Sequence, residues 1–338
     1  MVLFDELWFG SYGGCFISDA FTLGCDRYRE QFEQLVADEG FVAEYTALCK
    51  RYAPFSAELS PVEAALPSPV EACHVPWNAS ALIGCALVGA RLQKGVAHMG
   101  ARYADEALLA ARVCHELGLP LHMFLSKEAG AISSLIEQLE LLGVNVDTKM
   151  CAEIFDLPEM YAFQAWVSDA DASHLINVRA NCGAYPQANI ALAFSRTFGE
   201  RVLAAAGDAD RIVIPIRSGS TAAGILTALS DSAKTQVVCI ECDTAEDMVQ
   251  ELDSYCGAFT KVMRNRLEDR VIAPYLAYAE DEGRVARVAV APADVDFSIK
   301  AEQPLSLQSR AALTWACEHP AEGRTVVVTG DARWGTIV

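Results

Sequence analysis

Short apolar runs alternate with amphipathic segments along most of this chain, and this rhythm constrains the fold more than any other feature. Apolar residues at helical spacing predict a helix over 105–117, ended by Gly118, and another over 131–142, ended by Gly143. Strands are predicted at 96–98, 120–125, 144–146 and 174–178, with a further helix at 158–167. Strands that alternate with helices at this spacing are typical of βαβ units on a parallel sheet.

The second half repeats the rhythm with longer apolar runs. Helices are predicted at 188–206, from Ser220 onward and at 309–317, and strands at 211–216, 236–242 and 325–329. Continuous apolar strands indicate a sheet covered on both faces. The stretch 256–304 is irregular, and no strand is assigned there. We therefore expect an α/β protein with an N-terminal segment over 1–75, a smaller βαβ domain over 76–178 and a larger α/β domain over 179–338.

Charge and hydropathy exclude several classes of partner. The net charge of −19 repels phosphate backbones and anionic membranes, so no nucleic-acid or membrane partner is expected. No apolar run approaches the roughly 18 residues that a membrane helix needs. The first residues include Asp5 and Glu6, where a signal peptide carries basic residues. These features predict a cytoplasmic protein.

The twelve cysteines do not form a metal-binding or disulfide pattern. They are scattered and mostly lie among apolar residues, where free cysteine behaves as a small hydrophobe. Cys239 and Cys242 form the single CxxC motif, but it falls in a predicted strand, where side chains three positions apart point to opposite faces. We expect no metal site.

Several motifs, taken in order, resemble the β chain of tryptophan synthase. The glycine- and aromatic-rich start at 9–17, the acidic helix at 38–52, the helix from Gly84 to Arg91 and the turn at 218–221 each resemble a part of that family. The segments 304–310 and 326–333 resemble its last helix and strand. The resemblance covers most of the chain. It implies the two-domain architecture of fold-type II pyridoxal phosphate (PLP) enzymes, with sheets covered by helices on both faces, and a homodimer.

The departures from that family all concern PLP. The lysine that forms the Schiff base in the family falls at Asn78, and no lysine occurs between Lys50 and Lys94. An amide cannot form an internal aldimine, because that chemistry needs a nucleophilic amine. The family's acid–base glutamate falls at His98, its glycine-rich phosphate loop has become 217–220, and its serine near the pyridine nitrogen falls near Gly330 and Asp331. The resemblance therefore implies a relative that uses no cofactor.

The candidate site residues follow from these positions. His98 and Glu106 are the candidate acid–base residues, with His98 expected at the end of a strand. Arg102 and Arg217 are candidate carboxylate clamps, although each also suits a structural ion pair. The remaining candidate contacts to substrate lie before the Gly84 helix, where we expect His74 in a loop, or in the turn that opens the helix at Ser220: His74, Trp77, Asn78, Ser218, Gly219, Ser220 and Thr221.

This inventory suggests three functions. The first is a cofactor-independent enzyme that condenses an aromatic amino acid, expected to be L-tryptophan, with an aldehyde or keto acid. This is the Pictet–Spengler cyclisation to a β-carboline, as in bacterial Pictet–Spenglerases of alkaloid biosynthesis. The second is a non-catalytic protein that binds an amino acid. The third is a PLP enzyme whose lysine comes from another segment, such as Lys127 or Lys234.

Overall fold

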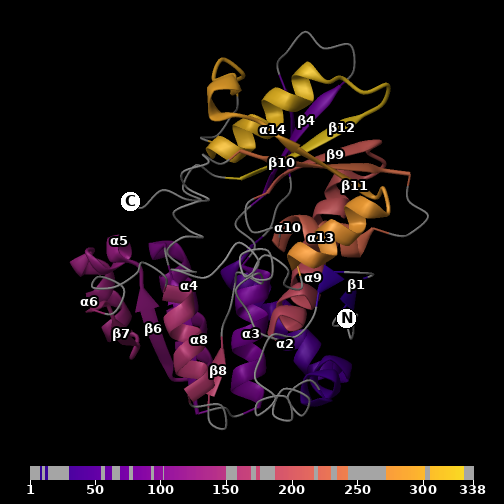
Figure 1. Ribbon diagram of the computed structural model, residues 1–338. Helices are drawn as coiled ribbons and strands as arrows, with labels where there is room; N and C mark the ends of the chain where they lie inside the picture. Colours follow the sequence, from indigo (N-terminus) through magenta and orange to yellow (C-terminus); the bar gives the residue numbers. More distant parts are fainter. Residues whose placement is uncertain are drawn as a thin grey trace.

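The computed structural model describes most of the chain, and Figure 1 shows how its elements are arranged. The described residues are 8–9, 12–13, 30–54, 58–62, 69–75, 79–92, 95–101, 103–149, 158–168, 173–175, 187–216, 220–229, 234–242, 272–300 and 305–330. In this part of the chain, no helix is long and apolar enough to cross a membrane.

A six-stranded sheet forms the larger layer, in the order β11-β10-β9-β12-β4-β3. Its strands are β3 (Glu58–Pro61), β4 (Val70–Val75), β9 (Arg211–Ile216), β10 (Gln236–Glu241), β11 (Val285–Ala289) and β12 (Thr325–Gly330). Only β3 pairs in the antiparallel sense, and the other pairs are parallel. Residues 256–304, expected to be irregular, contain both β11 and a helix. Strand β11 lies at the edge of the sheet with only Val285 buried, so it lacks the continuous apolar run of the central strands.

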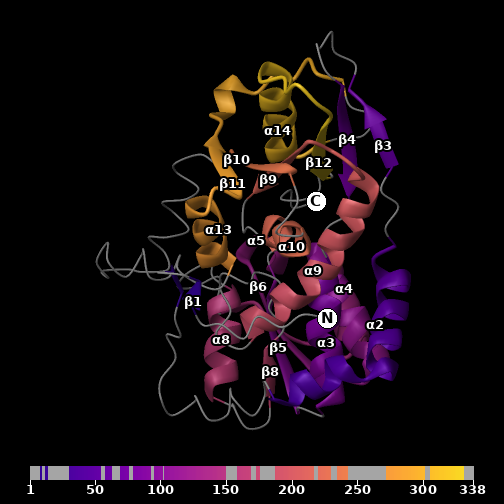
Figure 2. The ribbon, with the colours of Figure 1, turned by 90° about the vertical axis from the view of Figure 1, so that its right-hand side faces the viewer.

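Helices cover both faces of this sheet. One face packs against α9 (Gln187–Ala206), α10 (Ser220–Ala228) and α13 (Ile272–Asp281), and the other packs against α14 (Leu307–Glu318). Figure 2 shows α14 on one side of the strands and α10 and α13 on the other. Successive strand residues enter opposite cores: Ile212 and Ile214 lie in one, and Val213 in the other. Burial on both faces explains why the strands have continuous apolar sequences.

A second, four-stranded parallel sheet has the order β7-β6-β5-β8. Its strands are β5 (Val96–Ala101), β6 (Leu121–Leu125), β7 (Asn145–Asp147) and β8 (Ser173–Leu175). Its helices and those beside it are α2 (Glu39–Tyr52), α3 (Ser80–Arg91), α4 (Ala104–Leu117), α5 (Lys127–Gly130), α6 (Ser133–Leu141) and α8 (Pro158–Ser168). Left-handed Gly118 and Gly143 end α4 and the turn after α6, as their sequence positions predicted.

The remaining elements are short. Strands β1 (Trp8–Phe9) and β2 (Tyr12–Gly13) pair in the antiparallel sense, residues 30–37 are helical, and a 3-10 turn, η1, covers Pro292–Asp294. The α/β class predicted from the sequence is confirmed. The two cysteines of the CxxC motif point to opposite faces of the sheet, as predicted. Cys239 lies in the core under α10, and Cys242 lies in the core under α14. Within the described residues, no group of three or more potential ligands could hold a metal ion.

Candidate functional site

The carboxyl ends of the parallel strands gather the N-termini of several helices at one edge of the six-stranded sheet. Strand β4 ends at Val75 and leads into α3, and β9 ends at Ile216 and leads into α10. The amide of Ser306, which caps α14, donates to the carbonyl oxygen of Gly330 at the end of β12 (3.2 Å). Helix N-termini carry partial positive charge, so this edge favours an anionic group such as a carboxylate.

Two side-chain contacts join neighbouring segments at this edge. His74 of β4 and Thr329 of β12 are paired in register, and Nδ1 of His74 lies 3.4 Å from Oγ1 of Thr329. The amide of Gly330 donates to Oγ of Ser309 (2.9 Å), which fixes the last residue of β12 on the first turn of α14. His74, which we expected in a loop, is instead the fifth residue of a strand and is half-buried.

The link between β4 and α3 contains Asn78, at the position of the Schiff-base lysine in the resembled family. Residues 76–78, with Trp77 and Asn78, connect Val75 to Ala79, which precedes the first residue of α3. Trp77 and Asn78 themselves lie outside the described residues. Their neighbours place the link at the carboxyl end of a strand inside the larger sheet, beside β12. In open α/β sheets this is the edge at which ligands bind.

The turn after β9 lies at the same edge. Arg217, Ser218 and Gly219 are outside the described residues, and they connect Ile216 to Ser220, the first residue of α10. Thr221, in the first turn of α10, is half-buried. Helices α9 and α10 cross where a Cβ atom on Gly199 would lie 2.2 Å from the carbonyl oxygen of Gly224. This close approach holds α10 against α9.

Glu106 is a buried carboxylate just past the end of β5. It is the third residue of α4 and has 7% of its surface exposed, whereas the adjacent Asp105 is exposed. Arg102, four residues earlier, lies outside the described residues. In Figures 1 and 2, α5, which follows the carboxyl end of β6, lies at the end of the small sheet nearer the larger one. Strand β5 is parallel to β6, so its carboxyl end, just before Glu106, lies at this same end of the small sheet.

His98 does not end its strand, as we had expected. Strand β5 continues to Ala101, so His98 lies three residues before the carboxyl end. Ala97 and Met99 pack in the main core, so the alternation of the strand turns His98 to the opposite face. There its ring lies 5.4 Å from the ring of His122 on β6. The sequence did not predict the last three residues of β5, because Met99, Gly100 and Ala101 are not the β-branched residues typical of strands.

An aromatic row continues from His98 across this face. The ring of His122 lies 4.4 Å from that of Phe124, which stacks at 6.3 Å on Tyr161 of α8. His98 is buried, and His122 is half-buried. Burial lowers the pKa of His122, and the carboxylate of Asp147 opposes part of that shift. His98 therefore lies in a packed layer between the small sheet and α8.

The described lysines do not fit a PLP Schiff base. Lys50, Lys127, Lys149, Lys234 and Lys300 are all exposed. Lys234 precedes β10, at the opposite end of the sheet from the helix N-termini, and Lys127 opens α5 on the smaller layer. Lys94 and Lys261 lie outside the described residues. Lys300 is in the segment between β11 and α14. The link after β4 has Asn78 and no lysine.

Three solved structures with the same fold are enzymes. The chain superposes on a threonine deaminase from T.th. with a TM-score of 0.56 and 15% identity, over 87% of this chain and 99% of that one. A pyridoxal 5'-phosphate-dependent aspartate racemase matches with a TM-score of 0.55 and 11% identity, over 86% and 94%. An L-serine ammonia-lyase from Rhizomucor miehei matches at 0.53 and 12%, over 82% and 95%. No family model matches the sequence.

These likenesses establish the architecture. The chain has the fold-type II arrangement predicted from the sequence resemblance. Sequence reasoning did not identify Thr329 and Ser309 as residues at the edge. The end of the apolar run at Thr329-Gly330 was a usable signal for the first, because the carboxyl ends of parallel strands meet at one edge. No local signal marks Ser309, whose contact with Gly330 spans 21 residues.

Proposed function

We propose that this chain is an enzyme that works without PLP and condenses an aromatic amino acid, L-tryptophan in the first instance, with an aldehyde or keto acid. The observation that carries the proposal is the strand-to-helix link after β4. It lies at the ligand-binding edge of a fold-type II architecture and contains Asn78 where a Schiff base needs an amine.

A Pictet–Spengler cyclisation needs no cofactor. The substrate amine attacks the carbonyl carbon, water leaves, and an iminium ion forms. Carbon 2 of the indole then attacks the iminium carbon, and the new C–C bond closes the ring. Loss of the proton from carbon 2 restores the aromatic ring. The reaction therefore needs an acid for the loss of water, a base for the last proton and groups that orient the two substrates.

The roles are assigned by position. Arg217 and Arg102 bind carboxylate groups, since guanidinium groups match carboxylates with two parallel hydrogen bonds. Ser218 and Gly219 are assigned to the same anions because they directly precede α10 in the chain, and the amides of Ser220 and Thr221 lie in its first turn. The contacts to the amino-acid substrate are assigned to Trp77, Asn78 and His74. Glu106 is the first candidate base, because it is a buried carboxylate next to the carboxyl end of β5. His98 is the second candidate base, because it lies inside β5, three residues before the carboxyl end of the strand.

Two measurements test the proposal. The purified protein should lack the visible absorption of a PLP aldimine, and added PLP should restore no β-replacement activity. Stoichiometric PLP bound covalently to any lysine, shown by borohydride reduction and mass spectrometry, contradicts the proposal. Incubation with tryptophan and a panel of aldehydes and keto acids should give tetrahydro-β-carbolines, which mass spectrometry identifies as the sum of the two substrates less one water. Measurable tryptophan binding without product from any carbonyl partner would instead identify a protein that binds an amino acid without catalysis.

A further inference from the structure

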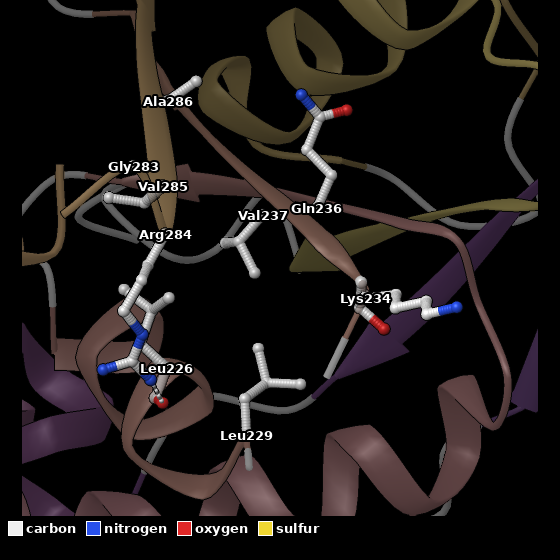
Figure 3. A pocket seen from close by; sticks show the side chains of 10 residues that line it. Leu226, Leu229, Lys234, Gln236, Val237, Gly283, Arg284, Val285 and Ala286 are labelled. Atoms are coloured by element: carbon white, nitrogen blue, oxygen red, sulfur yellow. Dashed lines mark hydrogen bonds between the residues drawn. The ribbon is translucent and has the colours of Figure 1, made fainter. Parts of the chain in front are cut away.

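The two ends of the six-stranded sheet arrange their polar side chains differently. At the start of β10 and β11, Arg284 and Lys234 line a cavity, but in Figure 3 they lie on opposite sides of it and Lys234 extends away from Arg284. The guanidinium group of Arg284 also donates to the carbonyl oxygen of Leu226 (3.3 Å). At the carboxyl edge, by contrast, the side chains of His74 and Thr329 contact each other directly.

His74 and Thr329 lie on the same face of the sheet. They are register partners on the neighbouring strands β4 and β12. Val327, two residues before Thr329, packs in the core under α14, so the alternation of the strand turns Thr329 to the α14 face as well. There Nδ1 of His74 lies 3.4 Å from Oγ1 of Thr329. The pairing of the two strands therefore brings the imidazole ring to the hydroxyl group.

Thr329 is the fixed member of this pair. It is buried on β12, which lies between β9 and β4 in the sheet. The next residue, Gly330, is held on α14, because its amide donates to Oγ of Ser309 (2.9 Å). Threonine is also β-branched, which restricts its side chain at χ1. His74 is only half-buried. The hydroxyl group of Thr329 therefore sets the place of the imidazole ring, and not the reverse.

The hydroxyl group of Thr329 also selects the tautomer of the ring. Within the described part of the chain, its one hydrogen-bond partner is Nδ1 of His74. A hydroxyl has a single proton to donate and two lone pairs, and a buried donor left without an acceptor is rarer in proteins than an acceptor with a spare lone pair. The hydroxyl of Thr329 therefore donates to Nδ1. In the neutral ring, the proton is then on Nε2.

We propose that Thr329 is a positioning residue for His74. Its hydroxyl donates to Nδ1 and keeps the ring in the Nε2–H form, so that His74 is a hydrogen-bond donor to the carboxylate of the amino-acid substrate. The contact to substrate rests on the proposed function, which assigns His74 to the amino acid. The tautomer does not depend on that function, because the pairing of β4 with β12 determines it in the free protein.

Nitrogen-15 NMR of the full chain with labelled histidine tests the tautomer without any ligand. The signals of His74 are those that His74→Ala removes. At mildly alkaline pH, where the ring is neutral, Nε2 should carry the proton. Thr329→Val keeps the shape of the side chain but should give a mixture of tautomers, and Thr329→Ser should restore the Nε2–H form. The control is Thr325→Val, at a buried threonine at the other end of β12, which should change nothing. An Nδ1–H ring in wild type, or a tautomer that Thr329→Val leaves unchanged, overturns the inference.

Calorimetry with tryptophan tests the contact to substrate. Thr329→Val should weaken tryptophan binding by about two- to tenfold, the range for one neutral hydrogen bond, and Thr329→Ser should recover most of the affinity. In a His74→Ala background, Thr329→Val should have no further effect, because Thr329 acts through the ring. An equal loss of affinity with and without His74 overturns the positioning role. A wild-type protein that binds no tryptophan contradicts the proposed function and the contact to substrate, whereas the tautomer measured by NMR still decides whether Thr329 positions the ring.

Discussion

Gly84 of α3 lies directly against the phenyl ring of Phe194 of α9, and a Cβ atom at Gly84 would be 2.2 Å from a carbon of that ring. Phe194 is fully buried, and Tyr45 packs against it with ring centroids 4.8 Å apart. This contact sets the distance between α3, which follows the link with Asn78, and α9, which precedes β9. Two segments of the candidate site thus depend on one glycine.

Gly84→Ala should lower the free energy of unfolding by about 1–3 kcal/mol, the usual cost of overpacking a core. Helix propensity alone predicts the opposite, a gain of about 1 kcal/mol. Urea denaturation distinguishes the two. Phe194→Leu should recover part of the loss when combined with Gly84→Ala, because the smaller side chain leaves room for the methyl group. A stabilised Gly84→Ala protein would show that the close contact does not exist.

Glu106→Gln should reduce turnover of tryptophan plus its carbonyl partner by about 10²–10⁴-fold, the usual contribution of a general acid or base. Tryptophan binding should change much less, because proton transfer acts in the transition state. Asp105→Asn is the matched control, since Asp105 is an exposed carboxylate on the same turn. His98→Ala tests the second candidate. If both Glu106→Gln and His98→Ala turn over at the wild-type rate, neither residue is the base, and His74 and Asp331 become the next candidates.

Arg217→Ala should weaken binding of the carboxylate-bearing substrate by about 1.5–3 kcal/mol, the range for hydrogen bonds to charged groups. The residue lies in the chain between the end of β9 and the start of α10, where a carboxylate would meet the helix N-terminus. Titration calorimetry measures the effect, and Arg112→Ala, at an exposed position on α4, is the control. A collapse of the melting temperature with Arg217→Ala would instead identify a structural ion pair.

His122 should make the protein less stable in mild acid. Burial holds the pKa of His122 below its ordinary value of 6.5, so protons bind the unfolded chain more tightly than the folded one. Its contribution to stability is therefore full above about pH 6.5 and is lost as the pH falls toward the folded pKa. In His122→Gln, the drop in unfolding free energy between about pH 7.5 and 5.5 should be smaller than in wild type. His115→Gln, at an exposed histidine, should keep the wild-type drop. Equal drops in all three proteins would show that His122 titrates alike in both states.

The sequence by itself determined the class of the fold. Periodicity placed α4, α9 and α10 and the strands β6, β9, β10 and β12 close to their observed bounds, because the pattern of burial on a helix or a two-sided sheet is written directly into local residue order. It also placed Cys239 and Cys242 on opposite faces. The absence of a lysine between Lys50 and Lys94 needs no structure at all.

The tertiary structure decided which residues meet. The pairing of His74 with Thr329 spans 255 residues and arises from the insertion of β12 between β9 and β4, which no local pattern encodes. The position of His98 under α8 depends on three further residues of β5, whose small or flexible side chains carry little strand signal. Local order fixes the elements, whereas strand pairing between distant segments fixes the sites, because that pairing depends on packing across the whole sheet.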